Sequence, residues 1–349
     1  MSDDKLNRRQ RWRLAKIEEE RQSRLERREK AQSAEVAAEL DDPRPGLVTA
    51  HYGNKVEVRG DDGEHQRCHF RASLDQLVVG DRVIWRAARG EGDGVVVGLE
   101  PRVTVIKRPD RYGKLKPVAA NLDQLVLVFA PLPVPSSEFL DRYLVAAELS
   151  GVPPCLVLNK ADLIDDRTRT RLDELCAIYQ QVGYTVLEVS AVAGTGIEAL
   201  ARQLDGRTSA LVGPSGVGKS SLMNALLPGA GAVTGELWAR SGEGRNTTRT
   251  SRLLPLAAGG TLIDSPGIGE FGLWNIDREE LLQGYIELQP LVQDCRFRNC
   301  SHQHEPGCAL LAAVDRGDVS RERLANFHEI AADQGTRRSS GRKPRGGHD

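Results

Sequence analysis

Short apolar runs separated by turns follow one another in the segment after residue 46. The turn pairs Gly53-Asn54 and Asp62-Gly63 separate runs that are each long enough for one strand. About five short strands in one compact segment are typical of a small OB-type barrel, and an SH3-like barrel would produce much the same pattern. The predicted strands are Leu47–His51, Lys55–Arg59, Arg67–Phe70, Arg82–Arg86 and Gly94–Leu99.

A different pattern begins near Asn121. Leu125–Phe129 and Cys155–Leu158 are continuous apolar runs, as expected for parallel strands that are buried on both faces of a sheet. Because such runs alternate with helical segments, a doubly wound α/β sheet is predicted, and the chain turns helical again after about Phe271. The other predicted strands are Val186–Val189, Ala210–Val212 and Thr261–Asp264, and the helices are Ser137–Leu149, Arg167–Gln181, Ile197–Leu204 and Ser220–Leu226.

Charge is distributed unevenly, although the net charge of the 349 residues is only −1. Residues 1–30 and 337–345 are rich in Lys and Arg, and such tails are often arms that bind phosphates. A solvated helix or a disordered end explains each tail equally well. No apolar run approaches the roughly 20 residues that span a bilayer, and no secretory signal is visible, so a cytoplasmic protein is expected.

A glycine-rich segment between a predicted strand and a predicted helix matches the phosphate-loop pattern G-x-x-x-x-G-K-[ST] in full. Gly216 and Gly218 let backbone N–H groups turn towards a β-phosphate, and the following helix directs its positive end at the same anion. Lys219 is expected to reach the β- and γ-phosphates, and the Ser220 hydroxyl to bind Mg²⁺. The predicted phosphate site comprises Gly213, Pro214, Ser215, Gly216, Val217, Gly218, Lys219, Ser220 and Ser221.

The segment NKAD at 159–162 directly follows an apolar strand and fits the guanine-reading pattern NKxD. The Asp162 carboxylate can accept from the N1–H and the exocyclic amine of guanine, whereas adenine would leave this charge unpaired. Asn159 is expected to brace the phosphate loop, and the Lys160 stem to lie over the ring. A Ser-Ala pair follows the next strand, where its backbone N–H should meet guanine O6. The predicted base site comprises Asn159, Lys160, Ala161, Asp162, Ser190 and Ala191.

Two further loops would complete a nucleotide switch. The segment DSPG at 264–267 fits DxxG, in which Asp264 would hold Mg²⁺ through water and the Gly267 N–H would meet the γ-phosphate. In the polar stretch before it, one of the two threonines Thr247 and Thr248, with Thr248 preferred, is expected to complete the Mg²⁺ shell, which would order the loop in the GTP state. Ile268 stands where Ras-like enzymes carry a water-orienting Gln, so another group must help or intrinsic hydrolysis should be slow. The predicted catalytic residues are Lys219, Asp264, Gly267 and Thr248.

The order of these motifs is rotated relative to that of ordinary GTPases. The usual order is phosphate loop, switch threonine, DxxG, NKxD and SA, whereas here NKxD and SA come first. A circular permutation can leave the spatial order of strands unchanged, because it joins the old termini and opens one surface loop. DxxG now leads directly into the C-terminal region, and we expect a change in this loop to act on that region.

Three of the six cysteines cluster with a histidine near the C-terminus. The spacing C-x₄-C-x-H-x₅-C offers three thiolates and one imidazole, a set typical of tetrahedral structural zinc. His304 is the alternative fourth ligand, although an exposed loop position is its simpler interpretation. Zinc would hold together a small region with little core of its own. The predicted zinc ligands are Cys295, Cys300, His302 and Cys308.

A barrel followed by NKAD, SA, GPSGVGKSS, DSPG and a Cys₃His cluster resembles the ribosome small-subunit-dependent GTPase A (RsgA or YjeQ) family, over roughly residues 42–332. The resemblance implies a late-stage maturation factor for the bacterial 30S subunit, whose GTPase is stimulated by that subunit. It also implies that the barrel and the zinc domain contact ribosomal RNA. The expected fold is multidomain: a charged extension (1–41), an OB barrel (42–112), a circularly permuted P-loop GTPase domain (113–273), a mostly helical zinc-binding domain (274–334) and a basic tail (335–349).

The first switch departs from the pattern of that family. The family usually reads G-x-H-T-T, whereas this chain has Asn246 at the His position, and Asn cannot take up a proton at neutral pH. Two functions are therefore open: a GTPase that hydrolysis releases from its RNA partner, and an RNA-binding assembly module in which GTP and GDP only toggle affinity. A GTPase that supports RNA modification is less well supported, because no second catalytic constellation is visible. A monomer is expected, since no heptad pattern is visible.

Overall fold

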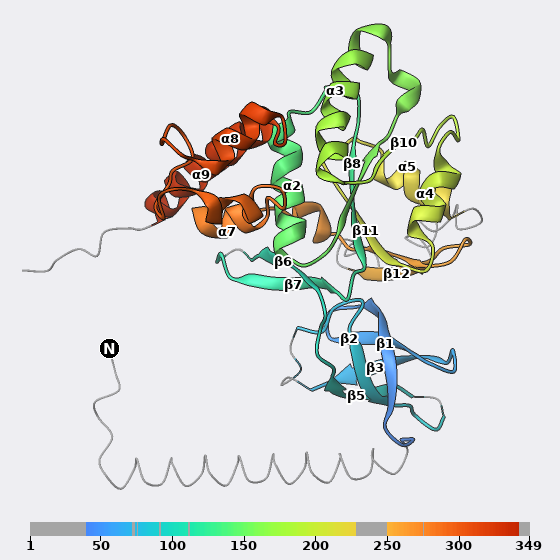
Figure 1. Cartoon of the computed structure of the whole chain (residues 1–349). Helices are drawn as coiled ribbons and strands as arrows, with labels where there is room; N and C mark the ends of the chain where they lie inside the picture. Colours follow the sequence, from blue (N-terminus) through green and yellow to red (C-terminus); the bar gives the residue numbers. More distant parts are fainter. Residues whose placement is uncertain are drawn as a thin grey trace, which may run out of the picture.

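The computed structural model describes residues 40–341, apart from 72–73, 75, 91, 111, 228–249 and 275. Predicted features at residues 1–39, at Asn246 and Thr248, and in the tail after residue 341 lie outside the described residues. Among the helices of the described ranges, none is long and apolar enough to cross a bilayer. Figure 1 shows a barrel, an α/β sheet above it, and helices that pack against one side of the α/β unit.

The N-terminal strands close into a five-stranded barrel. Their order is β1-β2-β3-β5-β4, and β4 returns to pair with β1. β3 and β5 pair in parallel, which distinguishes this barrel from an all-antiparallel SH3-like one and confirms the predicted OB type. Inside the barrel, the indole N–H of Trp85 donates to the Pro45 carbonyl over 3.2 Å. The strands are β1 Arg44–His51, β2 Lys55–Gly60, β3 His65–Phe70, β4 Arg82–Arg86 and β5 Gly94–Leu99.

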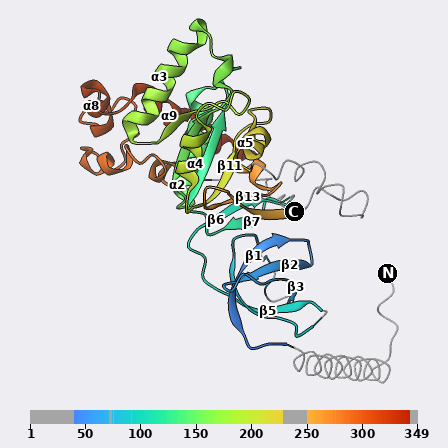
Figure 2. The ribbon, with the colours of Figure 1, turned by 90° about the vertical axis from the view of Figure 1, so that its right-hand side faces the viewer.

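A β-hairpin that the apolar pattern does not predict joins the barrel to the α/β unit. β6 (Val105–Pro109) and β7 (Leu115–Ala120) pair in antiparallel register, and residue 112 lies in the turn between them. Charged residues and two prolines interrupt any alternation of apolar positions in this segment, so the usual strand signal is lacking. The hairpin lies between the barrel and the α/β unit (Figure 2).

The central sheet has the order β10-β9-β8-β11-β13-β12 and is covered on both faces. Its first five strands are parallel, but β12 runs antiparallel to β13 and also pairs with β1, so the sheet is mixed and continues into the barrel. Along β8, Leu125 and Leu127 face one core, while Val126 and Val128 face another. The elements are β8 Gln124–Phe129, α2 Ser137–Leu149, β9 Pro154–Leu158, α3 Asp166–Val182, β10 Val186–Glu188, α4 Ile197–Leu204, β11 Thr208–Val212, α5 Lys219–Leu226, β12 Ser251–Pro255 and β13 Thr261–Asp264.

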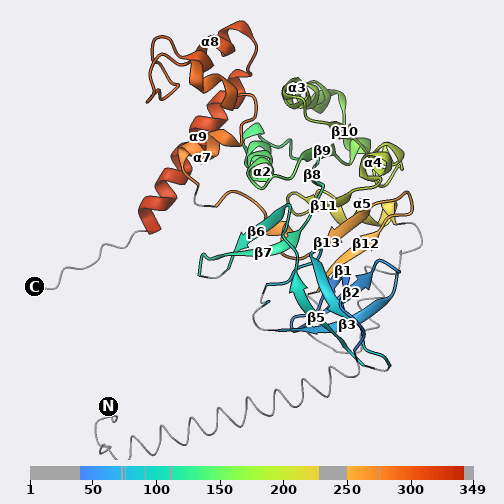
Figure 3. The same cartoon turned by 60° about the horizontal axis from the view of Figure 1, so that its bottom comes forward.

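The C-terminal helices share the main core of the α/β unit. Tyr285 and Phe327 belong to the same buried cluster as Leu140 and Leu144 of α2. The region therefore has more core than the sequence suggested, because α7 and α9 pack along α2 (Figure 3). The α-helices are α7 Arg278–Gln283, α8 Ala309–Arg316 and α9 Arg321–Gly341, and the 3₁₀ segments are η2 Ala161–Leu163, η4 Ile268–Glu270 and η5 Gln289–Asp294.

A buried ion pair ties α9 to α2. Arg323 and Asp141 are both fully buried and form a salt bridge, and Arg323 Nε also donates to Glu287 over 2.7 Å. The second Asp141 oxygen accepts from Asn326 over 2.8 Å, and the Tyr179 hydroxyl donates to Asp141 over 2.8 Å. Although burial opposes its charge, the two carboxylates raise the pKa of Arg323. A satisfied network of this kind favours one fixed packing of α9 on α2.

Replacing Arg323 by Met should lower the free energy of unfolding by about 3–5 kcal/mol, because two carboxylates would lose their buried cation. The double variant Arg323→Met/Asp141→Asn should recover part of this loss. Chemical denaturation of the metal-loaded chain measures the free energy of unfolding of both variants. Arg169→Met, which breaks an ion pair with Glu188 on the surface, is the matched control and should change stability little. Equal losses of unfolding free energy for Arg323→Met and Arg169→Met would contradict a stabilising role for the buried ion pair.

Candidate nucleotide site and metal centre

The phosphate loop connects β11 to α5 and depends on glycine at two close contacts. Gly213 has φ +136°, and a Cβ there would collide with the carbonyl oxygen of Val128. Gly218 has φ +93°, and a Cβ there would collide with the side-chain amide of Asn159. Side chains are therefore excluded on structural grounds at both ends of the loop. Ser215 and Gly216 between them are exposed, which leaves that part of the loop accessible to a ligand.

Lys219 begins α5 and reaches back over the loop. Its Nζ donates to the carbonyls of Gly213 over 2.8 Å and Pro214 over 2.7 Å. Burial lowers the pKa of Lys219, so an anion beside it would stabilise the charged form. The hydroxyl-bearing residues of the first turn, Ser220 and Ser221, are exposed. The loop thus places one ammonium, two hydroxyls and a helix N-terminus at the same point.

Asn159 joins the segment after β9 to the phosphate loop. It is buried, and its Nδ2 donates to the Val217 carbonyl over 2.8 Å. Its Oδ1 accepts from the backbone N–H of Ala191 at 3.2 Å. One side chain therefore connects three loops, which agrees with the bracing role that the sequence suggests. The Ala161 N–H donates to the Val189 carbonyl over 3.0 Å and adds a further tie between two of these loops.

Hydrogen bonds from Ser190 and Ala191 tie the Ser-Ala pair to the neighbouring loops. The Ser190 N–H donates to the Thr195 carbonyl over 2.9 Å, and the Ala191 N–H donates to Asn159. Both backbone donors are engaged within the protein, and their contact to guanine O6 stays a prediction. The buried Ser190 hydroxyl instead donates to the Asp162 carboxylate. This hydroxyl orients Asp162, and motif matching alone did not reveal it.

The DxxG segment lies at the end of β13, beside the phosphate loop. β13 pairs in parallel with β11, so their carboxyl ends lie next to each other. Burial raises the pKa of the half-buried Asp264, and Arg252 opposite it on β12 acts in the other direction. The hydroxyls of Ser251 and Ser265 are 2.7 Å apart and tie β12 to this segment. A carboxylate in this position could bind a cation near the phosphates.

Ile268 and Gly267 both face the protein rather than the solvent. Ile268 is 2% exposed and belongs to the main core, so its side chain cannot assist a water molecule. A Cβ at Gly267 would lie 2.8 Å from Cγ1 of Val118 and 3.1 Å from Nε of Arg108. The β6–β7 hairpin therefore packs directly against the DxxG backbone. The sequence offers no signal for this contact, since about 150 residues separate the two segments.

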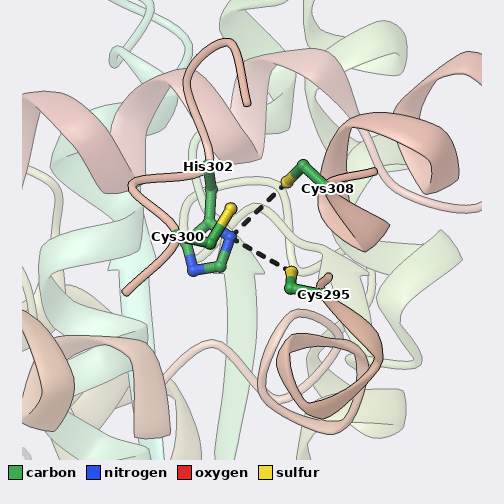
Figure 4. Close-up of side chains that lie close together, drawn as sticks. All are labelled: Cys295, Cys300, His302 and Cys308. Carbon is green, nitrogen blue, oxygen red and sulfur yellow. Dashed lines mark hydrogen bonds between the residues drawn. The ribbon is translucent and has the colours of Figure 1, made fainter. Parts of the chain in front are cut away.

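The four predicted metal ligands converge in one cluster (Figure 4). Their ligand atoms all lie within 4.8 Å of one another, and Nδ1 of His302 is 3.5 Å from Sγ of Cys295 and of Cys308. Burial lowers the pKa of His302, which keeps the imidazole in its neutral, metal-binding form. The cluster could hold one metal ion, and it does not include His304.

Groups around the cluster orient its ligands. The Ala309 N–H donates to Cys295 Sγ over 3.4 Å, and His328 Nε2 lies 3.1 Å from the carbonyl of His302. Burial raises the pKa of the Cys300 thiol to about 12, and a bound metal ion would stabilise its thiolate instead. The remaining cysteines, Cys68, Cys155 and Cys176, lie outside the cluster, the first two in apolar cores.

Fold and loops together define a P-loop GTPase of circularly permuted order. The model of the RsgA GTPase family matches residues 99–274. A relative from Alcanivorax borkumensis, called small ribosomal subunit biogenesis GTPase RsgA, is 57% identical over 337 residues, which cover 95% of this chain and 96% of that protein. The chain belongs to the RsgA GTPase family.

Solved structures agree with this assignment. The crystal structure of YjeQ from Thermotoga maritima matches with a TM-score of 0.70 and 31% identity, over 86% of this chain and all of that one. The structure of YloQ, described as a circularly permuted GTPase, matches with a TM-score of 0.68 and 25% identity, over 87% of this chain and 98% of that one. The barrel, the permuted domain and the C-terminal helices are therefore a shared architecture.

Proposed function

We propose that the chain hydrolyses GTP to GDP and phosphate as a late-stage maturation factor of the small ribosomal subunit. The observation that carries the GTPase assignment is Asn159, which connects the base-reading segment to the phosphate loop through Val217 and to the Ser-Ala loop through Ala191. A guanine held by Asp162 would then be fixed relative to phosphates held by the loop. The ribosomal assignment rests on family membership and on the name of the 57% identical relative.

Hydrolysis in this site is a matter of positioning and charge. Water attacks the γ-phosphorus, the bond from the γ-phosphorus to the β–γ bridging oxygen breaks, and a water proton ends on the released phosphate. Lys219 and the loop N–H groups stabilise the negative charge, and the Gly267 N–H contacts the γ-phosphate. The Ser220 hydroxyl, and Asp264 through water, would hold Mg²⁺, which would neutralise charge on the phosphate oxygens. Thr248, the expected further ligand, lies outside the described residues.

The Cys₃His cluster is proposed to hold one structural Zn²⁺. Three thiolates and one imidazole would complete the coordination of Zn²⁺, which would leave no position for a substrate. The barrel and the metal-bearing region are proposed as contacts to ribosomal RNA, and the chain is proposed to act as a cytoplasmic monomer. Because the segment after DxxG enters the core shared with α7 and α9, a nucleotide-dependent change at Gly267 has a short path to this region.

GTP turnover by the purified chain should be slow alone and should rise by about 100-fold or more with purified 30S subunits, because Ile268 gives no water-orienting group. Lys219→Ala should abolish both rates, whereas Lys160→Ala should retain stimulation despite weaker nucleotide binding. The rate of hydrolysis is measured for all three proteins as phosphate release under single-turnover conditions, with and without 30S subunits. If 30S binding depends on the nucleotide but turnover does not rise, the module that only toggles affinity is the correct function.

A further inference from the structure

Side chains of α7 and α9 form a second layer behind the metal cluster, which the proposed function does not use. Arg278 begins α7 and is half-buried. Its Nη2 group donates to the carbonyl of Ser301, which lies between the predicted ligands Cys300 and His302. On α9, Nε2 of His328 lies 3.1 Å from the carbonyl of His302 itself. Two helices thus hold two successive carbonyls of the ligand loop.

The backbone conformation of His302 explains why such support is needed. His302 has φ +57°, in the left-handed region that residues with a side chain seldom adopt. A conformation of this kind persists only where the surrounding structure holds it. The hydrogen bonds to the carbonyls of Ser301 and His302 fix the two peptide groups that flank this residue. They therefore fix the direction in which the imidazole points, towards Cys295 and Cys308.

The two supporting residues also contact each other. Burial lowers the pKa of His328, which favours the neutral imidazole, and a carbonyl can only accept, so the ring proton lies on Nε2. Nδ1 of His328 is then an acceptor, and Nη2 of Arg278 lies 3.4 Å from it. The same guanidinium lies over the ring of Phe327, 4.8 Å from the centroid. Arg278 is therefore held by α9 as well as by the ligand loop.

Charge is the second reason for a cation in this position. Three thiolates and one neutral imidazole around Zn²⁺ would carry one net negative charge. Burial lowers the pKa of Arg278, and the charges of Glu305 and Cys300 act in the opposite direction. The Glu305 carboxylate is itself engaged by the backbone N–H groups of Ser301 over 2.7 Å and Gln303 over 3.2 Å. A half-buried guanidinium offsets a nearby negative charge more strongly than an exposed one, because water and salt screen it less.

We propose that Arg278 is a positioning residue of the metal centre, which holds the ligand loop through the Ser301 carbonyl and offsets the negative charge of the metal-bound cluster. His328 completes the support through the carbonyl of His302. Neither residue is a metal ligand. Metal binding is thereby linked to the position of α7, the first helix after the nucleotide-binding domain. The identity of the metal as zinc rests on the proposed function, and the experiment separates the two.

The zinc affinity of the full chain is measured by competition with a chromogenic chelator. Arg278→Gln should lower this affinity about 10- to 100-fold, as is typical when a contact behind the ligands is lost. Arg278→Lys should recover part of the loss, because the charge returns without the planar guanidinium. The matched control is Arg296→Gln. Arg296 directly follows Cys295, but it is exposed and lies over the ring of Phe297, 5.4 Å from the centroid. Its loss should change zinc affinity by less than about threefold, because exposed charges are screened.

Two further measurements distinguish support from ligation. With Co²⁺ in place of zinc, Arg278→Gln should keep the visible absorption of a tetrahedral site with three thiolates, because all four ligands remain. His328→Leu removes the other contact and should lower zinc affinity about tenfold, which decides the question independently if Arg278→Gln does not fold. Chelating zinc should raise hydrogen exchange in α7 of the unaltered chain, whereas in Arg278→Gln this exchange should be raised with zinc still bound. Helix α4, which packs in another core, is the internal reference.

Several results would overturn the proposal. Unchanged zinc affinity in both Arg278→Gln and His328→Leu would refute the positioning role and leave the metal centre in place. Equal losses of affinity in Arg278→Gln and Arg296→Gln would show only a general effect of charge and would refute it too. Loss of thiolate absorption from the Co²⁺ form of Arg278→Gln would show that a ligand had left the metal, which contradicts a role behind the ligands. An unaltered chain that binds neither zinc nor Co²⁺ would refute the metal centre itself.

Discussion

Replacing Asp162 by Asn should change the nucleotide preference of the protein from guanine to xanthine. The carboxylate can accept two hydrogen bonds from guanine, and each bond to a charged group contributes about 1.5–3 kcal/mol. Losing both weakens GTP binding by about 100-fold or more. Xanthine has a carbonyl oxygen at C2 in place of the amine, and the new side-chain N–H can donate to it.

The surroundings of Asp162 favour a clean result. Ser190 donates its hydroxyl to this side chain, and the amide oxygen of Asn can accept the same bond, so the local fold should survive. Competition binding with GTP, XTP and ATP measures the change in nucleotide preference. Asp166→Asn, the same substitution at an exposed position in the first turn of α3, should leave GTP affinity unchanged. Equal losses of GTP affinity in both variants, or no gain in XTP affinity for Asp162→Asn, would show that Asp162 does not bind the base.

Removing the metal should unfold the loop from residue 295 to 308 and leave the nucleotide site intact. A structural zinc site contributes folding free energy directly, so losing a ligand should reduce the free energy of unfolding by at least about 3 kcal/mol. Damage should remain local, because α9 is held to α2 by Arg323 and Asp141 independently of the cluster. Elemental analysis should give one zinc per chain.

Two histidine variants distinguish the ligand set. His302→Ala should lose the metal and increase hydrogen exchange in η5 and α8, whereas His304→Ala should retain both metal and protection, because His304 lies outside the cluster. Cys176→Ser controls for the loss of a thiol elsewhere in the chain. Metal loss in His304→Ala, or retention in His302→Ala, would overturn the proposed ligands.

Local patterns in the sequence were sufficient for most elements and for the chemistry of the loops. Helix α4 runs from Ile197 to Leu204 as predicted, because its apolar spacing is periodic and complete within eight residues. The phosphate loop, NKxD and the Cys₃His set could also be recognised, since each requires particular residue types at short, fixed spacings. Such signals depend only on neighbours along the chain.

Contacts between distant segments were decided by the tertiary structure alone. No pattern along the chain marks Asp141 and Arg323 as partners, yet they are buried together because α9 packs on α2. β12 looks like part of a loop until β13 and β1 provide partners on its two edges. The packing of the hairpin against Gly267 also joins residues that are far apart in the chain.

The sequence by itself thus predicts which residues read a base, bind phosphates or bind a metal, because backbone freedom and side-chain chemistry are local properties. Only the folded chain decided how these groups are connected. Asn159 braces three loops, Ser190 orients Asp162, and Val118 contacts the switch, since each depends on the approach of strands that no spacing along the chain encodes.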